Sequence, residues 1–214
     1  MKERENQVTY TAANTYLSLN DLTAKTRNIW LVFHGIGYLS RYFLTHFREL
    51  DPEENYVIAP QAPSKYYLNN EYKHVGASWL TREQTAMEID NVLNYVDAVY
   101  KAEPLPPHCS LLVFGYSQGV SVALRWVARS KIRCQHLVLY AGGIPNELRA
   151  QDFDFLQKNV KITLMAGDRD EFLDEGRWMQ ETKKATALFG ERAEIKRFSG
   201  GHEIQKQLLK ELLP

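Results

Sequence analysis

A serine between two glycines is the residue of this sequence best placed to do chemistry. Gly115-Tyr116-Ser117-Gln118-Gly119 has the Gly-x-Ser-x-Gly pattern, and the four residues before it, 111–114, are apolar. The apolar residues after it recur at helical spacing: Val120, Ala123, Leu124 and Val127. A strand that turns sharply into a helix at such a serine is a nucleophile elbow, which lifts the hydroxyl above the sheet. Ser117 is therefore the candidate nucleophile.

A serine hydroxyl needs a base to take its proton, and His202 is the candidate because it follows a predicted strand near the end of the chain. A neutral imidazole accepts a proton at neutral pH, and the cation that forms needs a carboxylate on its other nitrogen. Asp168 and Asp170 both lie in a turn after another predicted strand. Serine, acid and histidine follow one another in the chain order of an α/β-hydrolase triad.

The elements that must position these residues are strands and helices in alternation. Continuous apolar runs predict buried strands, and 193–198 alternates as an outer strand should: 28–33, 56–59, 111–114, 136–141 and 161–166. Helices are predicted from the spacing of apolar residues and from capping signals: about 40–50, 81–100, 120–127, 174–189 and from 203. This order predicts an α/β protein with a mostly parallel sheet and helices on both faces, whose ligands bind at the carboxyl ends of the strands. Segments 8–11 and 15–19 predict an N-terminal antiparallel hairpin at the sheet edge.

Two further segments lie close to the predicted site. In His34-Gly35-Ile36-Gly37 the glycines allow a turn that aims the amide of Ile36 at the place that Ser117 reaches, while His34 itself is better explained as a structural residue that hydrogen-bonds the loop. The segment 64–80 has no clear period and is interpreted as a long loop. Its aromatic residues either wall a pocket or pack the loop onto the body, and both readings stay open: Tyr66, Tyr67, Tyr72 and Trp79.

The composition of the chain indicates which kinds of partner it binds. With 214 residues, of which 44% are hydrophobic and 12% aromatic, residues 1–214 can form a single domain with a full core. Twenty-six basic residues balance 26 acidic ones without long runs, which argues against nucleic-acid or polybasic membrane binding and favours a small-molecule partner. The polar start and the lack of a membrane-length apolar run predict no integral membrane association and a cytoplasmic location. Cys109 and Cys134 are expected to be small buried thiols, and no metal site is expected from them.

From about residue 28 to 205 the sequence resembles the phospholipase/carboxylesterase branch of the α/β-hydrolases, which includes bacterial carboxylesterases and acyl-protein thioesterases. The resemblance depends on the order and spacing of several short motifs, of which only the serine elbow is specific by itself. These motifs are His34-Gly35-Ile36-Gly37, Pro60-Gln61-Ala62-Pro63, Trp79, Gly115-Tyr116-Ser117-Gln118-Gly119, Gly167-Asp168-Arg169-Asp170 and Gly201-His202.

The resemblance implies a role for each matching residue. Ser117 is the nucleophile, Asp170 the acid, His202 the base, and the amides of Ile36 and Gln118 form the oxyanion hole. The chain departs from the family pattern at three places, and these departures leave the substrate open: Tyr38, Leu80-Thr81 and Glu171-Phe172-Leu173. Tyr38 and Trp79 are expected to form walls of the substrate site. Since both side chains are bulky, the site should suit short or medium acyl chains.

We expect a serine hydrolase that cleaves carboxylic esters of short to medium acyl chains through an acyl-enzyme, without a metal or organic cofactor. Lysophospholipids and protein thioesters are alternative substrates. A non-catalytic binding protein on a hydrolase fold is the alternative from another class. No segment between Leu137 and Ile162 is long or apolar enough for a helical lid. The sequence leaves open whether the chain forms a homodimer.

Overall fold

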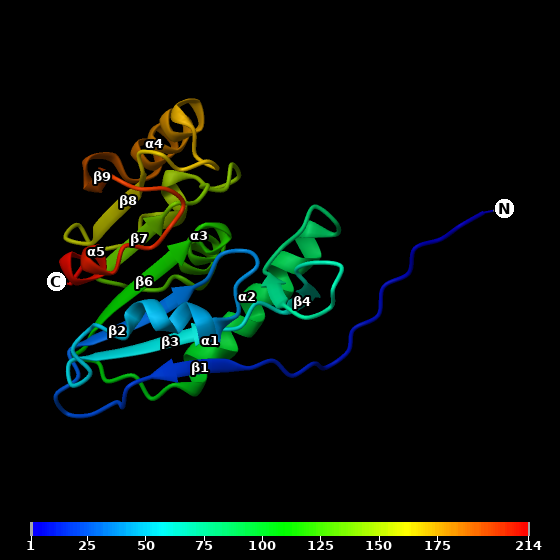
Figure 1. Ribbon diagram of the computed structural model, residues 1–214, viewed down its shortest axis with the longest axis horizontal. Coiled ribbons are helices and arrows are strands. Elements are labelled where there is room, and N and C mark those ends of the chain that lie inside the picture. The colour runs from blue at the N-terminus through cyan, green and yellow to red at the C-terminus, as the bar shows by residue number, and fades with distance from the viewer. Residues whose placement is uncertain (1, 214) are drawn as a thin grey trace.

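A seven-stranded sheet forms the centre of the molecule in the computed structural model, which describes residues 2–213 (Figure 1). The strands lie in the order β1-β3-β2-β6-β7-β8-β9. β1 is antiparallel to β3, and all the other neighbours are parallel. The strands are β1 (Tyr16–Leu19), β2 (Asn28–Phe33), β3 (Asn55–Pro60), β6 (Ser110–Tyr116), β7 (His136–Tyr140), β8 (Lys161–Gly167) and β9 (Ala193–Phe198).

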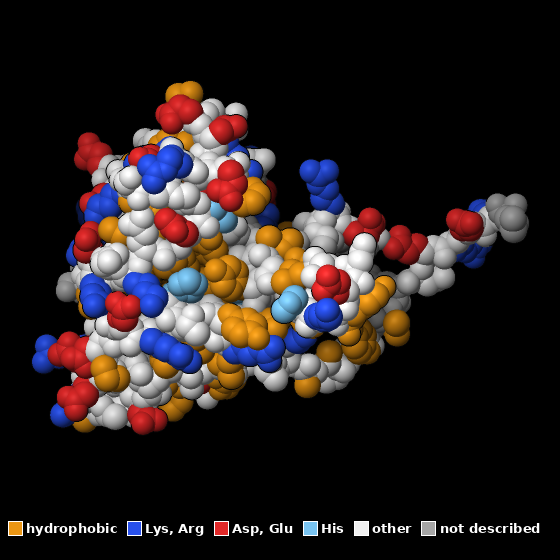
Figure 2. Space-filling model, viewed as in Figure 1, with side chains coloured by type: hydrophobic (Ala, Val, Ile, Leu, Met, Phe, Trp, Pro, Cys, Tyr) orange, Lys and Arg blue, Asp and Glu red, His pale blue; other side chains and the backbone are white. Residues whose placement is uncertain are grey.

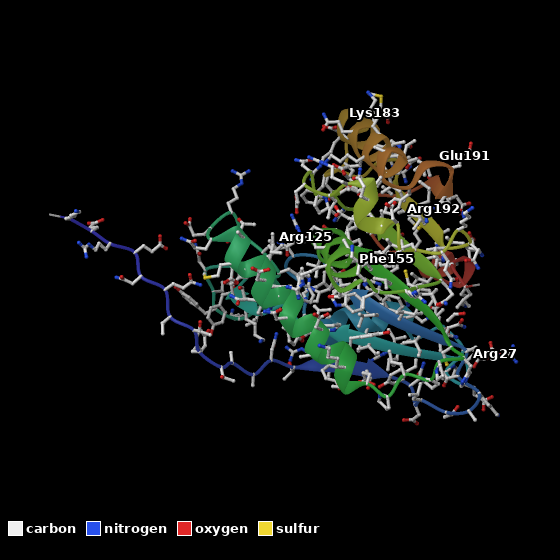
Figure 3. All side chains as sticks on the ribbon, turned by 180° about the vertical axis from the view of Figure 1, so that it is seen from behind. Arg27, Arg125, Phe155, Lys183, Glu191 and Arg192 are labelled. Carbon is white, nitrogen blue, oxygen red and sulfur yellow. The ribbon has the colours of Figure 1, made fainter. Side chains whose placement is uncertain are left out.

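Helices cover both faces of this sheet, as the continuous apolar strands predict. Every residue of β2 and of β3 is buried, so neither face of these strands meets solvent. α1 (Ser40–Phe43) and α5 (Lys206–Glu211) lie on one face. α2 (Thr85–Ala102), α3 (Gln118–Ser130) and α4 (Glu175–Phe189) lie on the other, where Arg125 marks α3 in the view from behind (Figure 3). Three short 3-10 helices complete the set: η1 (Leu44–Phe47), η2 (Ala150–Phe153) and η3 (Gly190–Arg192).

The antiparallel pairing predicted at the N-terminal edge of the sheet is present, and the strand that pairs with β1 is β3. Residues 8–11, expected as a strand, have no strand conformation and lie in an extended segment that runs away from the body (Figure 1). Val8 and Tyr10 are both more than four-fifths exposed. The β-branched and aromatic residues of this segment therefore find no neighbour to pair with or pack against.

The segment 64–80, interpreted from the sequence as a loop, contains a second small sheet. β4 (Ser64–Tyr67) and β5 (Val75–Ser78) pair antiparallel, with Tyr67 opposite Val75. All four residues of β4 are exposed, so the segment lacks the alternation of buried and exposed residues that would have marked a strand. This β4–β5 sheet stands beside the main body (Figure 1).

Three predicted helices begin or end differently in the structure. The helix expected over 40–50 is divided between α1 and η1 and ends at Phe47. α2 begins at Thr85 and not at 81, because Gln84 takes a left-handed conformation, and no side chain caps the helix. α5 begins at Lys206, three residues later than expected. Among residues 2–213 no helix is both long and apolar enough to cross a membrane.

Candidate active site

The serine elbow has the strained geometry that the sequence predicts. Ser117 lies between β6 and α3 with φ 53°, a positive value that a residue with a side chain rarely adopts. A Cβ on Gly115 would lie 2.6 Å from the Cα of Val120, and one on Gly119 would overlap the carbonyl of Phe33. Both glycines are therefore required by close backbone approaches. The Ser117 amide donates to the carbonyl of Tyr140 at 2.9 Å, which ties the turn to the end of β7.

Ser117, His202 and Asp170 form one chain of hydrogen bonds. Ser117 Oγ lies 3.0 Å from His202 Nε2, and His202 Nδ1 lies 2.8 Å from Asp170 Oδ2. A carboxylate only accepts, so the proton of the neutral ring is on Nδ1, and Nε2 is free to accept from the serine. The Asp170 side chain is fully buried and that of His202 is 12% exposed. This is the arrangement needed to move the serine proton to the imidazole.

The structure distinguishes the two aspartates of the turn after β8. Asp170 Oδ1 accepts hydrogen bonds from the amides of Phe172 and Leu173 at 2.9 and 3.1 Å, which fixes its carboxylate with Oδ2 toward the histidine. Asp168 instead accepts from the amide of Gly200 at 3.0 Å and does not contact His202. Asp168 thus secures the loop that carries His202, across the turn between β9 and α5.

Ile36 and Gln118 are the residues whose amides the sequence proposes for an oxyanion hole. Both residues line the same cavity as Ser117. Within residues 2–213 neither amide donates to a protein acceptor, whereas the neighbouring amide of Gly37 bonds the carbonyl of Ala77 at 2.9 Å. Gln118 is also the first residue of α3, where helix amides are unpaired and the dipole favours negative charge.

The side chain of Gln118 connects the elbow to the segment after β5. Gln118 Oε1 accepts from the amide of Trp79 at 2.8 Å, and Nε2 donates to the carbonyl of Leu80 at 2.6 Å. The side chain of Ser78 lies between them, 3.1 Å from Nε2. These bonds hold the first turn of α3 in place. Nothing in the spacing of the elbow indicated that this glutamine would have such a role.

Trp79 corrects one expectation from the sequence. Its side chain is fully buried and does not line the cavity, so it does not wall the substrate site. The indole Nε1 donates to the carbonyl of His34 at 2.8 Å, and the ring lies 5.7 Å from that of Phe33. Trp79 therefore packs beneath the loop that presents Ile36. Tyr38, the other residue expected at the wall, does line the cavity.

His34 is a fully buried residue of that loop, in agreement with the structural role expected for it. The ring donates from Nδ1 to the carbonyl of Gly35 at 2.8 Å and accepts at Nε2 from the amide of Ala62 at 3.1 Å. This pattern requires the neutral ring. Burial lowers the pKa of His34 to about 4, and the bond to Gly35 opposes only part of this effect.

The cavity at Ser117 has a volume of about 450 Å³ and is open to solvent. Between β7 and β8 the chain forms only η2, so no helical lid covers the cavity. Its wall includes two residues that the sequence did not indicate, Phe172 and Arg177. Phe172 is 59% exposed, and its ring lies 4.8 Å from the ring of His202. Residues 2–213 contain no group of three or more His, Cys, Asp or Glu side chains that could hold a metal ion.

Tyr116 also contacts His202, and the sequence did not indicate this role. Its hydroxyl donates to the carbonyl of His202 at 2.8 Å, and the two rings lie 5.1 Å apart. Tyr116 occupies a variable position of the elbow motif, which carries no expectation for the side chain. Burial, as the largest effect, raises its pKa, so the phenol keeps the proton that it donates.

A mostly parallel sheet covered by helices on both faces, with a serine elbow after a central strand, defines the chain as an α/β-hydrolase. Its sequence matches the family profile described as phospholipase/carboxylesterase over residues 16–213. The chain belongs to this family and is a hydrolase of the esterase class. A search of curated proteins finds no match.

Solved structures with the same fold share little sequence with this chain. Acyl-protein thioesterase 2 of Zea mays is 17% identical, with 93% of this chain and 96% of that chain covered and a TM-score of 0.68. Esterase PE8 is 19% identical, with 94% and 100% covered and a TM-score of 0.68. A phospholipase/carboxylesterase from Dyadobacter fermentans is 19% identical, with 95% and 97% covered and a TM-score of 0.62. At these identities the likeness shows the fold alone.

Proposed function

We propose that the chain is a serine hydrolase that cleaves carboxylic esters of short to medium acyl chains through an acyl-enzyme. The observation that carries the proposal is the unbroken chain of hydrogen bonds from Ser117 Oγ through His202 to Asp170, at 3.0 and 2.8 Å. The open cavity around Ser117 gives an ester direct access to the hydroxyl.

The proposed reaction has two halves. His202 Nε2 takes the proton of Ser117 as Oγ bonds to the ester carbonyl carbon, and the amides of Ile36 and Gln118 stabilise the oxyanion. His202 then gives its proton to the leaving alcohol as the ester C–O bond breaks, which leaves an acyl group on Ser117. In the second half His202 takes a proton from water, whose oxygen attacks the acyl carbon. The acid leaves, and the proton returns to Ser117.

The experiment that tests the proposal uses a fluorophosphonate probe together with 4-nitrophenyl butyrate. Wild-type protein should be labelled and should hydrolyse the ester, and Ser117→Ala should lose the label and on the order of 10⁶ of the turnover. Ser110→Ala is the matched control, because Ser110 lies at the opposite end of the same strand. Ester hydrolysis by Ser117→Ala at the wild-type rate would instead favour a binding protein with an unused triad.

Chain length is the second property to measure. Acetate and butyrate esters should show simple saturation, and emulsified long-chain triglycerides should be poor substrates, because no lid shelters a long acyl chain and Tyr38 narrows the cavity. A series from two to sixteen carbons, measured below and above the aggregation limit, tests this. A rate that rises sharply on aggregation would contradict it.

Thioesters are a second candidate substrate class. A groove of about 500 Å³ shares Ile36 and Tyr38 with the cavity and continues toward the β4–β5 sheet. Its lining combines apolar residues with Arg41, Lys73 and His74, and Figure 2 shows hydrophobic, basic and histidine side chains close together on this face of the molecule. The groove provides room for a large leaving group, such as the thiol of a peptide. Comparing matched oxygen esters and thioesters of one acyl chain would separate the two classes.

A further inference from the structure

Arg177 is the only residue with a fixed charge among those that line the cavity at Ser117 in the described chain. The rest of the wall is apolar, glycine, or neutral polar, apart from the ring of His202. Asp170 lies behind His202 with its side chain fully buried, so its charge faces the imidazole and not the cavity. The cavity therefore presents one cation and no anion to whatever enters it.

The first turn of α4 and the loop before it fix the position of Arg177. Its amide donates to Oδ1 of Asp174, the N-cap residue of α4, at 2.8 Å. Its Nη1 donates to the backbone carbonyl of Phe172 at 3.1 Å, and the ring of Phe172 lies 4.8 Å from that of His202. A Cβ on Gly143 would lie 3.4 Å from Nη2, so the guanidinium lies close to Gly143, another residue that lines the cavity.

No carboxylate of the described chain neutralises this guanidinium by a direct ion pair. The nearest acidic side chain across Gly143 is Glu181, which is buried and already has other partners. Its Oε1 pairs with Lys184 Nζ at 2.9 Å, and its Oε2 accepts from the amide of Ile144 at 2.6 Å. The hydrogen-bonding edge of Arg177 that Phe172 does not occupy is therefore available to a ligand.

We infer that Arg177 binds a carboxylate carried by the substrate, so that the enzyme selects esters with an anionic end. This inference rests on the proposed function, because it concerns the specificity of the same site. A guanidinium suits this role, since its planar set of N–H donors matches the two oxygens of a carboxylate. The carboxylate could belong to the acyl part or to the alcohol part of the ester, and the experiment separates these sources.

The test measures kcat/KM for two pairs of esters, in each of which a carboxylate is compared with a neutral group of similar size. For the acyl side the pair is the mono-4-nitrophenyl ester of adipic acid and its methyl-capped neutral form. For the alcohol side the pair is 4-acetoxybenzoate and 4-acetoxybenzamide. For each pair, kcat/KM of the charged ester is divided by kcat/KM of the neutral ester. A change that affects both esters equally cancels in this ratio.

Wild-type protein is compared with Arg177→Gln, Arg177→Lys and the control Arg133→Gln. Arg133 is exposed and lies before β7, at the opposite end of the sheet, so its replacement removes the same charge far from the cavity. For one of the two pairs, Arg177→Gln should lower the ratio about tenfold, mainly through KM, and Arg177→Lys should restore part of it. About 0.5 M salt should reduce the wild-type ratio in the same pair.

Ratios that change less than twofold in Arg177→Gln for both pairs would overturn the inference. So would an equal change in Arg133→Gln, because the effect would then come from net charge. These failures differ from failure of the proposed function. In that case wild-type protein would hydrolyse neither ester of either pair, and the fluorophosphonate would not label Ser117.

Discussion

Lowering the pH from 7 to 5 should destabilise the folded chain, because the fold buries His34 in its neutral form. Burial lowers the pKa of His34 to about 4, whereas an unfolded histidine has a pKa of about 6.5. Between these two values the unfolded chain binds a proton that the folded chain does not. The stability that the neutral ring contributes is therefore complete above about pH 6.5 and is lost as the pH falls toward 4.

The size of this effect follows from the two pKa values. At pH 5 the folded ring is still mostly neutral, whereas the unfolded ring is protonated, because this pH lies about one and a half units below its pKa. This difference lowers the free energy of unfolding by about 2 kcal/mol. The geometry gives the same direction, because Nε2 of His34 accepts from the amide of Ala62, and a proton there would set two N–H groups against each other. The full loss by pH 4 is about 3 kcal/mol.

Urea unfolding at pH 7 and pH 5 measures the loss for wild type, for His34→Gln and for His108→Gln. His34→Gln removes the titrating group, so its loss between the two pH values should be about 2 kcal/mol smaller than that of wild type. His108 is exposed, and its replacement should leave the wild-type loss unchanged. Other buried histidines, such as His136, contribute equally to all three proteins and cancel. Equal losses in His34→Gln and wild type would refute the reasoning.

Four further substitutions test the site and its support. Asp170→Asn should lower turnover by roughly 10⁴, and Asp168→Asn by much less, because only Asp170 contacts His202; a larger loss at Asp168 with folding intact would reverse the assignment. Trp79→Phe should destabilise the fold by about 1 kcal/mol through the lost bond to the His34 carbonyl, and thermal unfolding checks this. Its acyl-length profile should match wild type, since Trp79 does not line the cavity at Ser117. Gly119→Ala should cost on the order of 4 kcal/mol in unfolding free energy, because its Cβ overlaps the Phe33 carbonyl.

The parts of the fold that could be predicted are those where local pattern and tertiary environment agree. Asn28–Phe33 is an unbroken apolar run, and in the structure every one of its residues is buried between two layers of helices. The serine elbow is similar, because the glycines that mark it in the sequence are the ones that close backbone contacts require. The order of strands and helices then places Ser117, Asp170 and His202 at one edge of the sheet.

The parts that could not be predicted depend on partners far away in the sequence. Residues 8–11 have the composition of a strand, yet they do not pair with β1, whose strand neighbour is the distant β3. The aromatic ring of Trp79 could face a cavity or the core with equal ease. The ring faces the core because its N–H group finds an acceptor there, the carbonyl of His34, 45 residues earlier in the chain.

Arg177 shows the same limit at the site. Its position in the first turn of α4 follows from the helical pattern, but its place at the cavity depends on the path of residues 170–174 between strand and helix. No short-range signal marks that path. Tyr116 and Phe172 likewise meet the ring of His202, at 5.1 and 4.8 Å, only because the fold brings distant segments together.

The wide separation of Ser117, Asp170 and His202 along the chain has a consequence for how the protein folds. Ser117 and His202 are 85 residues apart, and Asp170 and His202 are 32 apart, so loop closure must precede every contact among them. Long-range contacts in a parallel sheet form slowly, whereas helices form within microseconds. During refolding from urea, helical circular dichroism should therefore return before fluorophosphonate labelling. The return of labelling at Ser117, the proposed nucleophile, would then report when the C-terminal strands dock.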